Sequence, residues 1–381
     1  MKKIAIIGAG ISGLFIANLF KRNTNYQITI FEKNASISLE EGYGVQLSVN
    51  SVRLLNEIGF EELQKNEKFT PKKIDFYSID DKTKICELDI SEFNSKDCKY
   101  TTLKRSSLVN FLKKELLDTI KTNSDISKID QMDKKVRLSF ENNNIDEFDY
   151  LIIADGVFSK SKGLVSKKKT QPKYNKTLAI RGILNKPPEN IVNRNINLFL
   201  GSDFHHVIYP VNSSGEFNFI AIMKYNLTED EQKNYSLYND KNFIKKILEH
   251  IPKQSQKLLE EIKELKVFPV FTSNNFFRTK NDNIHIIGDA FFAFPPSFAQ
   301  GASQSIEAAY ELFKAIENNT ELDFFKHRVR KTKMVNTRSK INQFAFHLSN
   351  PFTTFVRNIF LKRLVKNKKF LESYLGKIYN N

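Results

Sequence analysis

The sequence predicts an α/β protein in which a doubly wound, mostly parallel unit is interleaved with a smaller antiparallel-sheet domain and followed by C-terminal helices. Three observations support this class. The first 32 residues follow the order strand, glycine-rich turn, helix, strand, acid. Two later apolar strands, near residues 150 and 285, end at Asp-Gly and Gly-Asp pairs. Between them, residues 177–223 alternate apolar and polar positions, as antiparallel strands do.

The glycine-rich turn carries the most specific signal. Gly8 permits a tight turn, Gly10 lets the backbone approach a pyrophosphate, and Gly13 lets the following helix pack close to the strand. The helix N-terminus offers unpaired N–H groups, and Glu32 at the end of the second strand can accept hydrogen bonds from a ribose. The pattern therefore predicts a Rossmann-type site for an adenine dinucleotide, either FAD or NAD. The predicted contacts are Gly8, Gly10, Ser12, Gly13, Glu32 and Lys33.

Two further segments place acids where open α/β sheets bind ligands. The apolar strand 148–153 stops before Asp155-Gly156, and the strand 283–287 stops before Gly288-Asp289. The carboxyl ends of parallel strands meet at one edge of a sheet, so both carboxylates should reach the same site. A proline-rich loop and Gln300-Gly301 follow, before a helix expected from about Gln304.

In this order the motifs resemble the class A flavoprotein monooxygenases, single-component FAD enzymes of the p-hydroxybenzoate and salicylate hydroxylase type. The resemblance extends from Met1 to about Ser349. It implies FAD as cofactor, NAD(P)H and O₂ as co-substrates, and hydroxylation of a small phenolic or benzoate-like aromatic compound through a flavin C4a-hydroperoxide. A non-catalytic flavin-binding protein is the non-enzymatic alternative. A flavin halogenase is disfavoured because its signature requires tryptophan, which this chain lacks.

The resemblance also assigns roles to residues. It implies that Asp289 binds the ribityl chain of FAD, that Asp155 serves FAD and indirectly NAD(P)H, and that Arg105 contacts phosphate or the reductant. Pro296 would line the reactive face of the flavin and is a catalytic candidate, while the segment 42–50 would pass over the flavin. The other expected cofactor contacts are Gly44, Val45, Gly156, Gly288, Gln300, Gly301, Ala302 and Ser303.

Three positions depart from the family pattern. Phe292 stands where a histidine is usual, Ala309 where an acid is usual, and Lys162 where an arginine is common. We expect these three changes to affect the fine tuning of the site rather than the fold.

Candidates for substrate chemistry lie in the alternating strands. His206 and Tyr209 are the catalytic candidates for removing a phenolic proton, and Arg181, His205 and Tyr225 are candidates for substrate contact. Each such side chain is also a common core-edge residue in a strand. The chain has 33 phenylalanines, which favours an apolar pocket. Those expected near the flavin loop are Phe291, Phe292, Phe294 and Phe298.

Length and composition fit a two-domain protein. A chain of 381 residues is longer than one hydrophobic core usually supports, and a hydrophobic content of 40% is sufficient for two packed domains. The expected FAD-binding domain comprises residues 1–70, 98–166 and 271–330, the substrate domain 71–97 and 167–270, and the C-terminal helices 331–381. Cys86 and Cys98 have no metal or redox spacing, and no metal site is expected. Without a signal-peptide pattern, a cytoplasmic location is expected.

The charge balance is strongly basic, with 59 Lys and Arg against 43 Asp and Glu, concentrated in 160–176 and 326–377. Genomic base bias is one explanation, and a face toward anionic lipid is the other. No nucleic-acid-reading module is present. The tail 351–366 is amphipathic, with Phe352, Phe355, Val356, Ile359, Phe360 and Leu364 on one broad face. Such a face packs on its own protein or on a membrane, and the second reading favours a hydroxylase of a lipophilic polyprenyl phenol in quinone biosynthesis.

Overall fold

The computed structural model describes residues 1–37, 43–166, 171–187, 191–262, 265–273, 275–279 and 282–379. Gly42 and residues 167–170 of the first basic run lie outside the described residues. Within the described residues, no helix is both long and apolar enough to cross a membrane.

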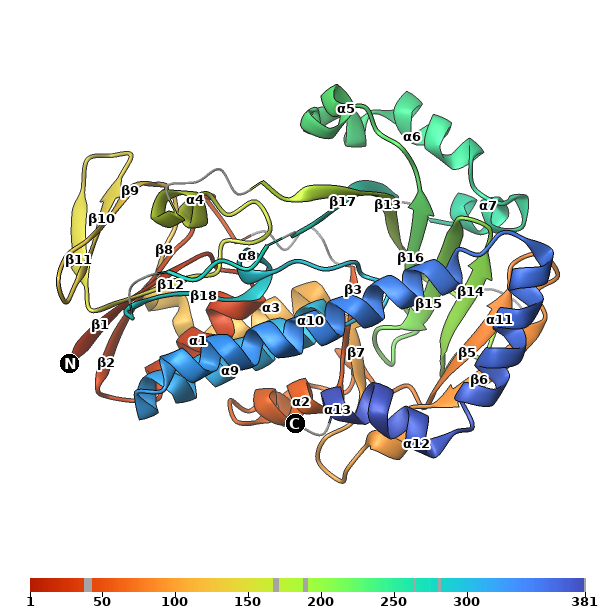
Figure 1. Cartoon of the computed structure of the whole chain (residues 1–381), viewed down its shortest axis with the longest axis horizontal. Helices are drawn as coiled ribbons and strands as arrows, with labels where there is room; N and C mark the ends of the chain where they lie inside the picture. The colour runs from red at the N-terminus through yellow and green to blue at the C-terminus, as the bar shows by residue number, and fades with distance from the viewer. Residues whose placement is uncertain are drawn as a thin grey trace.

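A five-stranded parallel sheet, sheet A, forms one half of the molecule (Figure 1). Its strand order is β18 (Ile284–Ile286), β12 (Tyr150–Ile153), β1 (Lys2–Ile7), β2 (Tyr26–Phe31) and β8 (Ile120–Lys121). The sheet therefore unites three distant parts of the chain. The strands that end at Asp-Gly and Gly-Asp lie on one side of β1, as parallel neighbours.

Alternation along β1 gives sheet A two packed faces. Ile4 and Ile6 point into a core with the helices α1 (Ile11–Lys21), α3 (Arg105–Lys113) and α9 (Gly301–Asn318). Ala5 and Ile7 point to the opposite face, which a three-stranded antiparallel sheet covers. That sheet contains β9 (Ile126–Gln131), β10 (Val136–Phe140) and β11 (Ile145–Phe148), and β10 and β11 form a hairpin whose turn includes Asn142.

The other half is built on sheet C, which has seven strands. Their order is β17 (Lys266–Thr272), β13 (Lys173–Leu184), β16 (Phe217–Lys224), β15 (Phe204–Pro210), β14 (Ile196–Gly201), β5 (Lys73–Ser78) and β6 (Lys84–Asp89). All neighbours are antiparallel except β14 and β5, which pair in parallel. The helices α5 (Glu229–Lys233), α6 (Lys241–Glu249) and α7 (Lys253–Glu260) lie on one side of this sheet (Figure 1).

Smaller elements connect the two halves. The strands β3 (Gly44–Leu47), β7 (Thr101–Lys104) and β4 (Lys68–Phe69) form a short sheet next to α2 (Val49–Asn56). Two short helices, α4 (Lys160–Ser166) and α8 (Gly288–Phe291), follow the ends of β12 and β18. Short 3-10 helices cover Phe60–Glu62, Ser91–Phe93, Lys114–Thr119 and Tyr235–Asn239, and a π-helical segment covers Glu372–Gly376.

The C-terminal helices join both halves. The helix α10 (Glu321–Phe346) runs beside α9 and continues to sheet C, where Gln343 accepts a hydrogen bond from Asn175 at 3.1 Å (Figure 1). The chain then forms α11 (Pro351–Leu364), α12 (Lys368–Leu371) and α13 (Lys377–Tyr379). The predicted α/β class, with an antiparallel second sheet and a C-terminal helical segment, is confirmed.

Candidate active site

A cavity of about 940 Å³ lies between the two halves of the molecule. The turn between β1 and α1 and the ends of β12 and β18 form one end of it, and one face of sheet C forms its wall. Residues of α10, α11 and α12 close the remaining side. The cavity therefore connects the predicted dinucleotide turn with the predicted substrate sheet.

The glycine turn is packed so tightly that side chains would not fit. A Cβ atom on Gly13 would lie 2.1 Å from the carbonyl oxygen of Gly8, and one on Gly8 would lie 2.6 Å from that of Ala154. Gly8 also has φ +101°, a left-handed conformation that favours glycine. Gly10 and Ser12 line the cavity, so the N-terminus of α1 opens into it, and no side-chain hydrogen bond caps that N-terminus among the described residues. Free N–H groups at this place suit a phosphate.

Glu32 lies directly beside this turn. One carboxylate oxygen accepts a hydrogen bond from the N–H of Ala9 at 3.1 Å, and the other accepts one from the N–H of Asn34 at 3.0 Å. The adjacent Lys33 is exposed and does not line the cavity. The structure thus brings the acid, but not the lysine side chain, to the glycine turn.

Two carboxylates at the sheet edge have unmet hydrogen-bonding capacity. Asp155 accepts a hydrogen bond from the N–H of Ser161 at 3.1 Å through one oxygen, while its other oxygen is buried without a partner in the described chain. Asp289 lines the cavity, and its side chain is accessible there. Burial raises the pKa of its carboxyl to about 6, and the nearby charge of Arg105 partly offsets this effect. Asp289 is therefore suited to accept hydrogen bonds from hydroxyl groups of a ligand in the cavity, whereas Asp155 lies beside the cavity without lining it.

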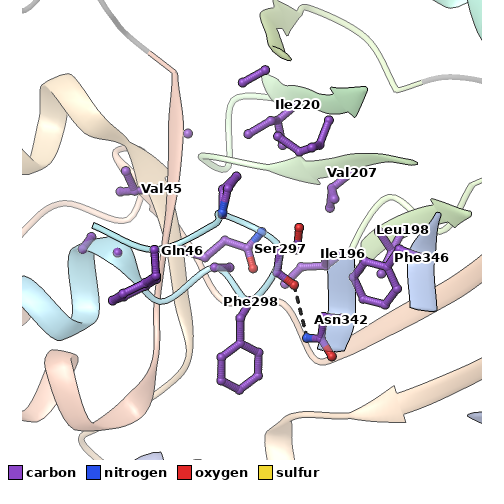
Figure 2. Close-up of a pocket in the computed structure, with 18 of the residues that line it drawn as sticks. Val45, Gln46, Ile196, Leu198, Val207, Ile220, Ser297, Phe298, Asn342 and Phe346 are labelled. Atoms are coloured by element: carbon purple, nitrogen blue, oxygen red, sulfur yellow. Dashed lines mark hydrogen bonds between the residues drawn. The ribbon is translucent and has the colours of Figure 1, made fainter. Parts of the chain in front are cut away.

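The loop after α8 crosses the centre of the cavity. Phe294, Pro296 and Phe298 line it, and Ala299 adopts a left-handed φ of +50°. Asn342 of α10 donates a hydrogen bond to the carbonyl oxygen of Ser297 at 3.2 Å (Figure 2). Because α10 holds this loop from outside, the position of Pro296 depends on the C-terminal helices.

Strand β15 shows which predicted substrate residues reach the cavity. His205, Val207 and Tyr209 alternate along the strand and all line the cavity. Arg181 of β13 also lines it, with its guanidinium 5.8 Å from the ring centre of Tyr43. Burial raises the pKa of the Tyr209 phenol above its usual value, so this hydroxyl keeps its proton and can donate a hydrogen bond.

Comparison with known proteins identifies the family. Residues 1–320 match the sequence model of the family described as FAD binding domain. The chain belongs to this family. FAD is its cofactor, and it is an FAD-dependent monooxygenase of the class A aromatic hydroxylase type, as its motifs predict.

Individual relatives are distant but match over most of their length. The 6-hydroxynicotinate 3-monooxygenase of Bordetella bronchiseptica is 22% identical, with 96% of this chain and 98% of the relative covered. The 3-amino-4-hydroxybenzoate 2-monooxygenase PtmB3 of Streptomyces platensis is 22% identical, with 91% and 89% covered.

Solved structures of low sequence identity share the fold. HpxO of Klebsiella pneumoniae, complexed with FAD and uric acid, has a TM-score of 0.86 at 16% identity, with 99% of this chain and 96% of that chain covered. A salicylate hydroxylase substrate complex has a TM-score of 0.78 at 18% identity, with 100% and 95% covered.

In this monooxygenase some sequence-based assignments need correction. His206 points to the opposite face of sheet C, where its ring stacks on Phe199 at 4.5 Å and its Nδ1 lies 3.3 Å from the hydroxyl of Ser255. Burial lowers its pKa to about 3. The alternation of the strand places His206 on the side of sheet C away from His205 and outside the cavity, which argues against its predicted catalytic role. Tyr225 likewise lies outside the cavity, with its ring beside that of His250 at 5.7 Å.

Other predicted residues lie near the cavity without lining it. Phe291 and Phe292 pack against Phe276 in the core below sheet A, so only Phe294 and Phe298 of the four predicted phenylalanines reach the cavity. The remaining predicted cofactor residues that line the cavity are Gly44, Val45, Gly156, Gly288, Gly301 and Ala302.

Gln300 and Ser303 are buried beneath the start of α9. The hydroxyl of Ser303 accepts a hydrogen bond from the N–H of Ser48 at 3.1 Å and lies 2.9 Å from that of Ser51. The amide nitrogen of Gln300 is buried without a partner in the described chain. Ser303 thus ties α9 to α2, a packing role that the motif alone does not indicate.

The apolar wall of the cavity includes residues that the sequence reading missed. Figure 2 shows Ile196, Leu198, Val207 and Ile220 of sheet C on one side and Val45 and Gln46 on the other. Helical residues complete the wall: Ile341, Ala345, Phe346, Leu361, Leu364, Val365, Phe370, Leu371, Tyr374, Leu375 and Tyr379. The sequence does indicate the helical wall residues, because the tail has apolar residues on two faces of its helix. Our prediction considered only one of these faces.

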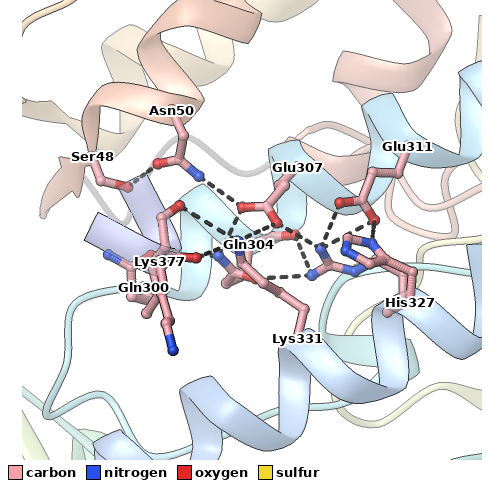
Figure 3. Close-up of polar contacts among 11 residues, drawn as sticks. Ser48, Asn50, Gln300, Gln304, Glu307, Glu311, His327, Lys331 and Lys377 are labelled. Atoms are coloured by element: carbon pink, nitrogen blue, oxygen red, sulfur yellow. Dashed lines mark hydrogen bonds and ion pairs between the residues drawn. The ribbon is translucent and has the colours of Figure 1, made fainter. Parts of the chain in front are cut away.

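A buried polar network fixes the C-terminal helices to α9 (Figure 3). The carboxylate of Glu307 pairs with Arg328 at 3.0 Å and with Lys331 at 3.2 Å. Its second oxygen accepts a hydrogen bond from Asn50 at 2.7 Å. Lys331 also donates to the carbonyl oxygen of Lys377 at 3.3 Å. The network therefore connects α2, α9, α10 and the end of the chain around one carboxylate.

Proposed function

We propose that this monooxygenase uses NAD(P)H and O₂ to hydroxylate an aromatic compound with a largely apolar body and one phenolic or acidic oxygen. The cavity carries the proposal, because it runs from the glycine turn to a chamber with apolar walls that also contains Arg181 and Tyr209. A planar ring suits the walls, and a polar substituent suits these two side chains.

The residues present fit FAD. The packed glycines and the uncapped N-terminus of α1 suit the pyrophosphate, and Glu32 suits the adenosine ribose. We assign Asp289 to the ribityl chain, because it stands in the cavity next to Arg105 with its carboxylate available. The free oxygen of Asp155 and the free amide of Gln300 are further polar groups that a ligand or ordered water would satisfy.

Bound FAD would supply the redox chemistry, taking electrons from NAD(P)H and passing one oxygen atom of O₂ to the ring. The protein groups bind, orient and exclude water. Arg181 would hold the anionic oxygen of the substrate, and Tyr209 would donate a hydrogen bond to it. The loop with Pro296, held by Asn342, would fix the distance between ring and flavin.

His205 would be an uncharged polar side chain in the wall of the chamber. Its Nδ1 lies 2.7 Å from Nε2 of His347, and burial together with that neighbour holds its pKa well below the usual value. A neutral imidazole can accept a hydrogen bond from a phenol without placing a charge beside the ring.

We also propose a division into two domains followed by C-terminal helices, and a cytoplasmic location. Residues 1–70, 98–166 and 271–330 would form the FAD-binding domain, 71–97 and 167–270 the substrate domain, and 331–381 the C-terminal helices. Among the described residues Cys86 and Cys98 are free thiols, which fits a cytoplasmic protein.

A flavin spectrum and a substrate screen test this function. Purified protein should be yellow, and phenols and benzoates should be screened for faster NAD(P)H consumption with formation of hydroxylated product. Asp289→Ala should lose FAD, whereas Asp118→Ala, on the exposed surface beside Lys21, should keep it. A colourless protein that binds no added FAD would refute the cofactor site. Stable flavin without substrate-stimulated oxidation would favour the non-catalytic alternative.

A second candidate substrate is a lipophilic phenol with an isoprenoid chain. The observation that favours it is the long apolar wall formed by α10, α11 and α12, which extends the chamber beyond the size of a single ring. Product analysis with a short-chain prenyl phenol and with an unsubstituted phenol would separate the two. A lower KM for the prenyl compound is expected if the wall binds the chain.

A further inference from the structure

The helix α11 has a solvent-facing side that its own protein does not cover. Phe352, Phe355 and Ile359 recur at intervals of three and four residues, so they lie on one side of the helix. Their exposed fractions are 74%, 63% and 38%. Lys362, Arg363 and Lys366 continue this side toward the C-terminus, and all three are exposed. We call these six residues the α11 outer face. Of the predicted apolar face, Leu364 lines the cavity of its own protein, whereas Phe352, Phe355, Ile359 and Phe360 are exposed.

The opposite side of the same helix belongs to the cavity. Leu361, Leu364 and Val365 line it, and the buried guanidinium of Arg357 donates to the carbonyl oxygen of Ala345 at 3.3 Å. Figure 1 shows α11 at the edge of the molecule beside β5 and β6. One helix thus separates the cavity from the outside. Ile341 of α10 both lines the cavity and is 53% exposed, which marks an apolar edge of its wall.

More exposed apolar groups lie close to this face in the chain. Phe344 is 72% exposed at the end of α10, and Phe360 is 58% exposed on α11. Large aromatic side chains that recur in this way on a helix are typical of a surface that meets another apolar phase.

The positive charge around the α11 outer face indicates which kind of partner would bind there. Between Phe324 and Leu371 the sequence contains 13 Lys and Arg residues and no Asp or Glu. Of the acids on the neighbouring strands β5 and β6, Asp75 and Glu87 are already paired, because both contact Lys84. A second copy of the chain would bring the same positive charge against itself. A bilayer with anionic headgroups offers the opposite charge and an apolar interior.

We propose that the α11 outer face docks on the surface of an anionic lipid bilayer, with α11 parallel to the membrane plane. Phe352, Phe355 and Ile359 enter the headgroup and acyl boundary, while Arg363 and Lys366 pair with lipid phosphates. Docking places the cavity wall at the membrane, where a lipophilic aromatic compound could enter past Ile341. The proposal does not depend on turnover, so its failure and that of the proposed function are distinguishable.

Vesicle flotation of the full-length FAD-bound protein tests the proposal. The vesicles are phosphatidylcholine alone and an equal mixture of phosphatidylcholine and phosphatidylserine. We expect recovery with the mixed vesicles only, and release at high salt. Phe352→Ser/Phe355→Ser and Arg363→Glu/Lys366→Glu should each weaken binding by about tenfold or more. The matched controls are Leu117→Ser, which is 67% exposed on the other half, and Lys134→Glu/Lys135→Glu near β10, and these should bind as wild type.

All variants should keep their flavin spectrum and their thermal midpoint, because the changed side chains are exposed. Equal recovery with both vesicle types, or unchanged binding by both α11 variants, would overturn the proposal. Analytical ultracentrifugation supplies a further check. A wild-type dimer that Phe352→Ser/Phe355→Ser converts to a monomer, without vesicle binding, would assign the face to a second copy instead.

Discussion

Replacing Glu307 by glutamine should destabilise this protein more than any other single-atom exchange in the network of Figure 3. The side chains of Glu307, Arg328 and Lys331 are 5%, 3% and 2% exposed, so the three charges are almost fully removed from water. Glutamine keeps the size of the side chain but removes the negative charge. Both cations then remain buried with reduced compensation.

The contacts set the expected magnitude. Breaking a buried ion pair by removing one partner costs about 3–5 kcal/mol. Arg328 keeps Glu311 at 3.3 Å, and Lys331 keeps the carbonyl oxygen of Lys377 at 3.3 Å, so the lower end applies. We expect a loss of about 3 kcal/mol in the free energy of unfolding, which changes the folding equilibrium more than a hundredfold.

Urea unfolding of the FAD-free protein measures this loss. The chain has no tryptophan, so circular dichroism is the suitable signal. Glu311→Gln is the matched control, because it lies one turn further on the same helix and its side chain is 23% exposed. It should cost less than about 1 kcal/mol. The reasoning is refuted if the two variants are equally stable, since the buried charges would then contribute nothing beyond the exposed ones.

Three other changes have defined outcomes. Gly13→Ala should weaken FAD binding by about tenfold or more, because the added Cβ would displace α1 from the backbone of Gly8. Gly163→Ala is the control and should bind FAD as wild type, because its added Cβ meets no atom within 4 Å. Flavin fluorescence titration measures both variants. The raised pKa of Asp289, about 6, means that the folded FAD-free protein holds a proton that the unfolded chain releases, so its stability should fall as pH rises from about 4 to 6. Because the side chain of Asp289 is accessible, solvent screening reduces the effect, and we expect a loss of about 1.5 kcal/mol that Asp289→Asn abolishes in paired unfolding curves. Identical slopes for the two proteins would exclude the effect. Tyr209→Phe should lower kcat for a phenol by about tenfold, while His206→Gln should leave kcat within about twofold, and the reverse result would reassign the two residues.

The fold class could be predicted because its signals are local. The glycine turn, the acid after β2 and the strand ends at Asp155 and Asp289 each depend on a few consecutive residues. The alternation over residues 177–223 also predicted antiparallel strands, which are β13 to β16 of sheet C.

The substrate side could not be predicted to the same depth, because the register of a strand decides which face each residue occupies. His205 and His206 are neighbours in sequence, yet only His205 lines the cavity. The same limit applies to the tail, where one helix carries both a cavity face and an outer face. Which side is covered depends on contacts with β6 that no local pattern encodes. The charged network around Glu307 was missed because its partners come from helices far apart in sequence.

The strand order of sheet A has a consequence for synthesis. β1 is made first, but its neighbour β12 begins at Tyr150 and β18 follows only at Ile284. One edge of β1 therefore stays unpaired until β12 is made, and the outer edge of β12 then stays unpaired until β18 is made. An unpaired apolar edge invites aggregation, and long-range parallel pairing forms slowly. The antiparallel neighbours β14, β15 and β16 of sheet C follow one another in the chain, so their pairing is complete before β18 is made.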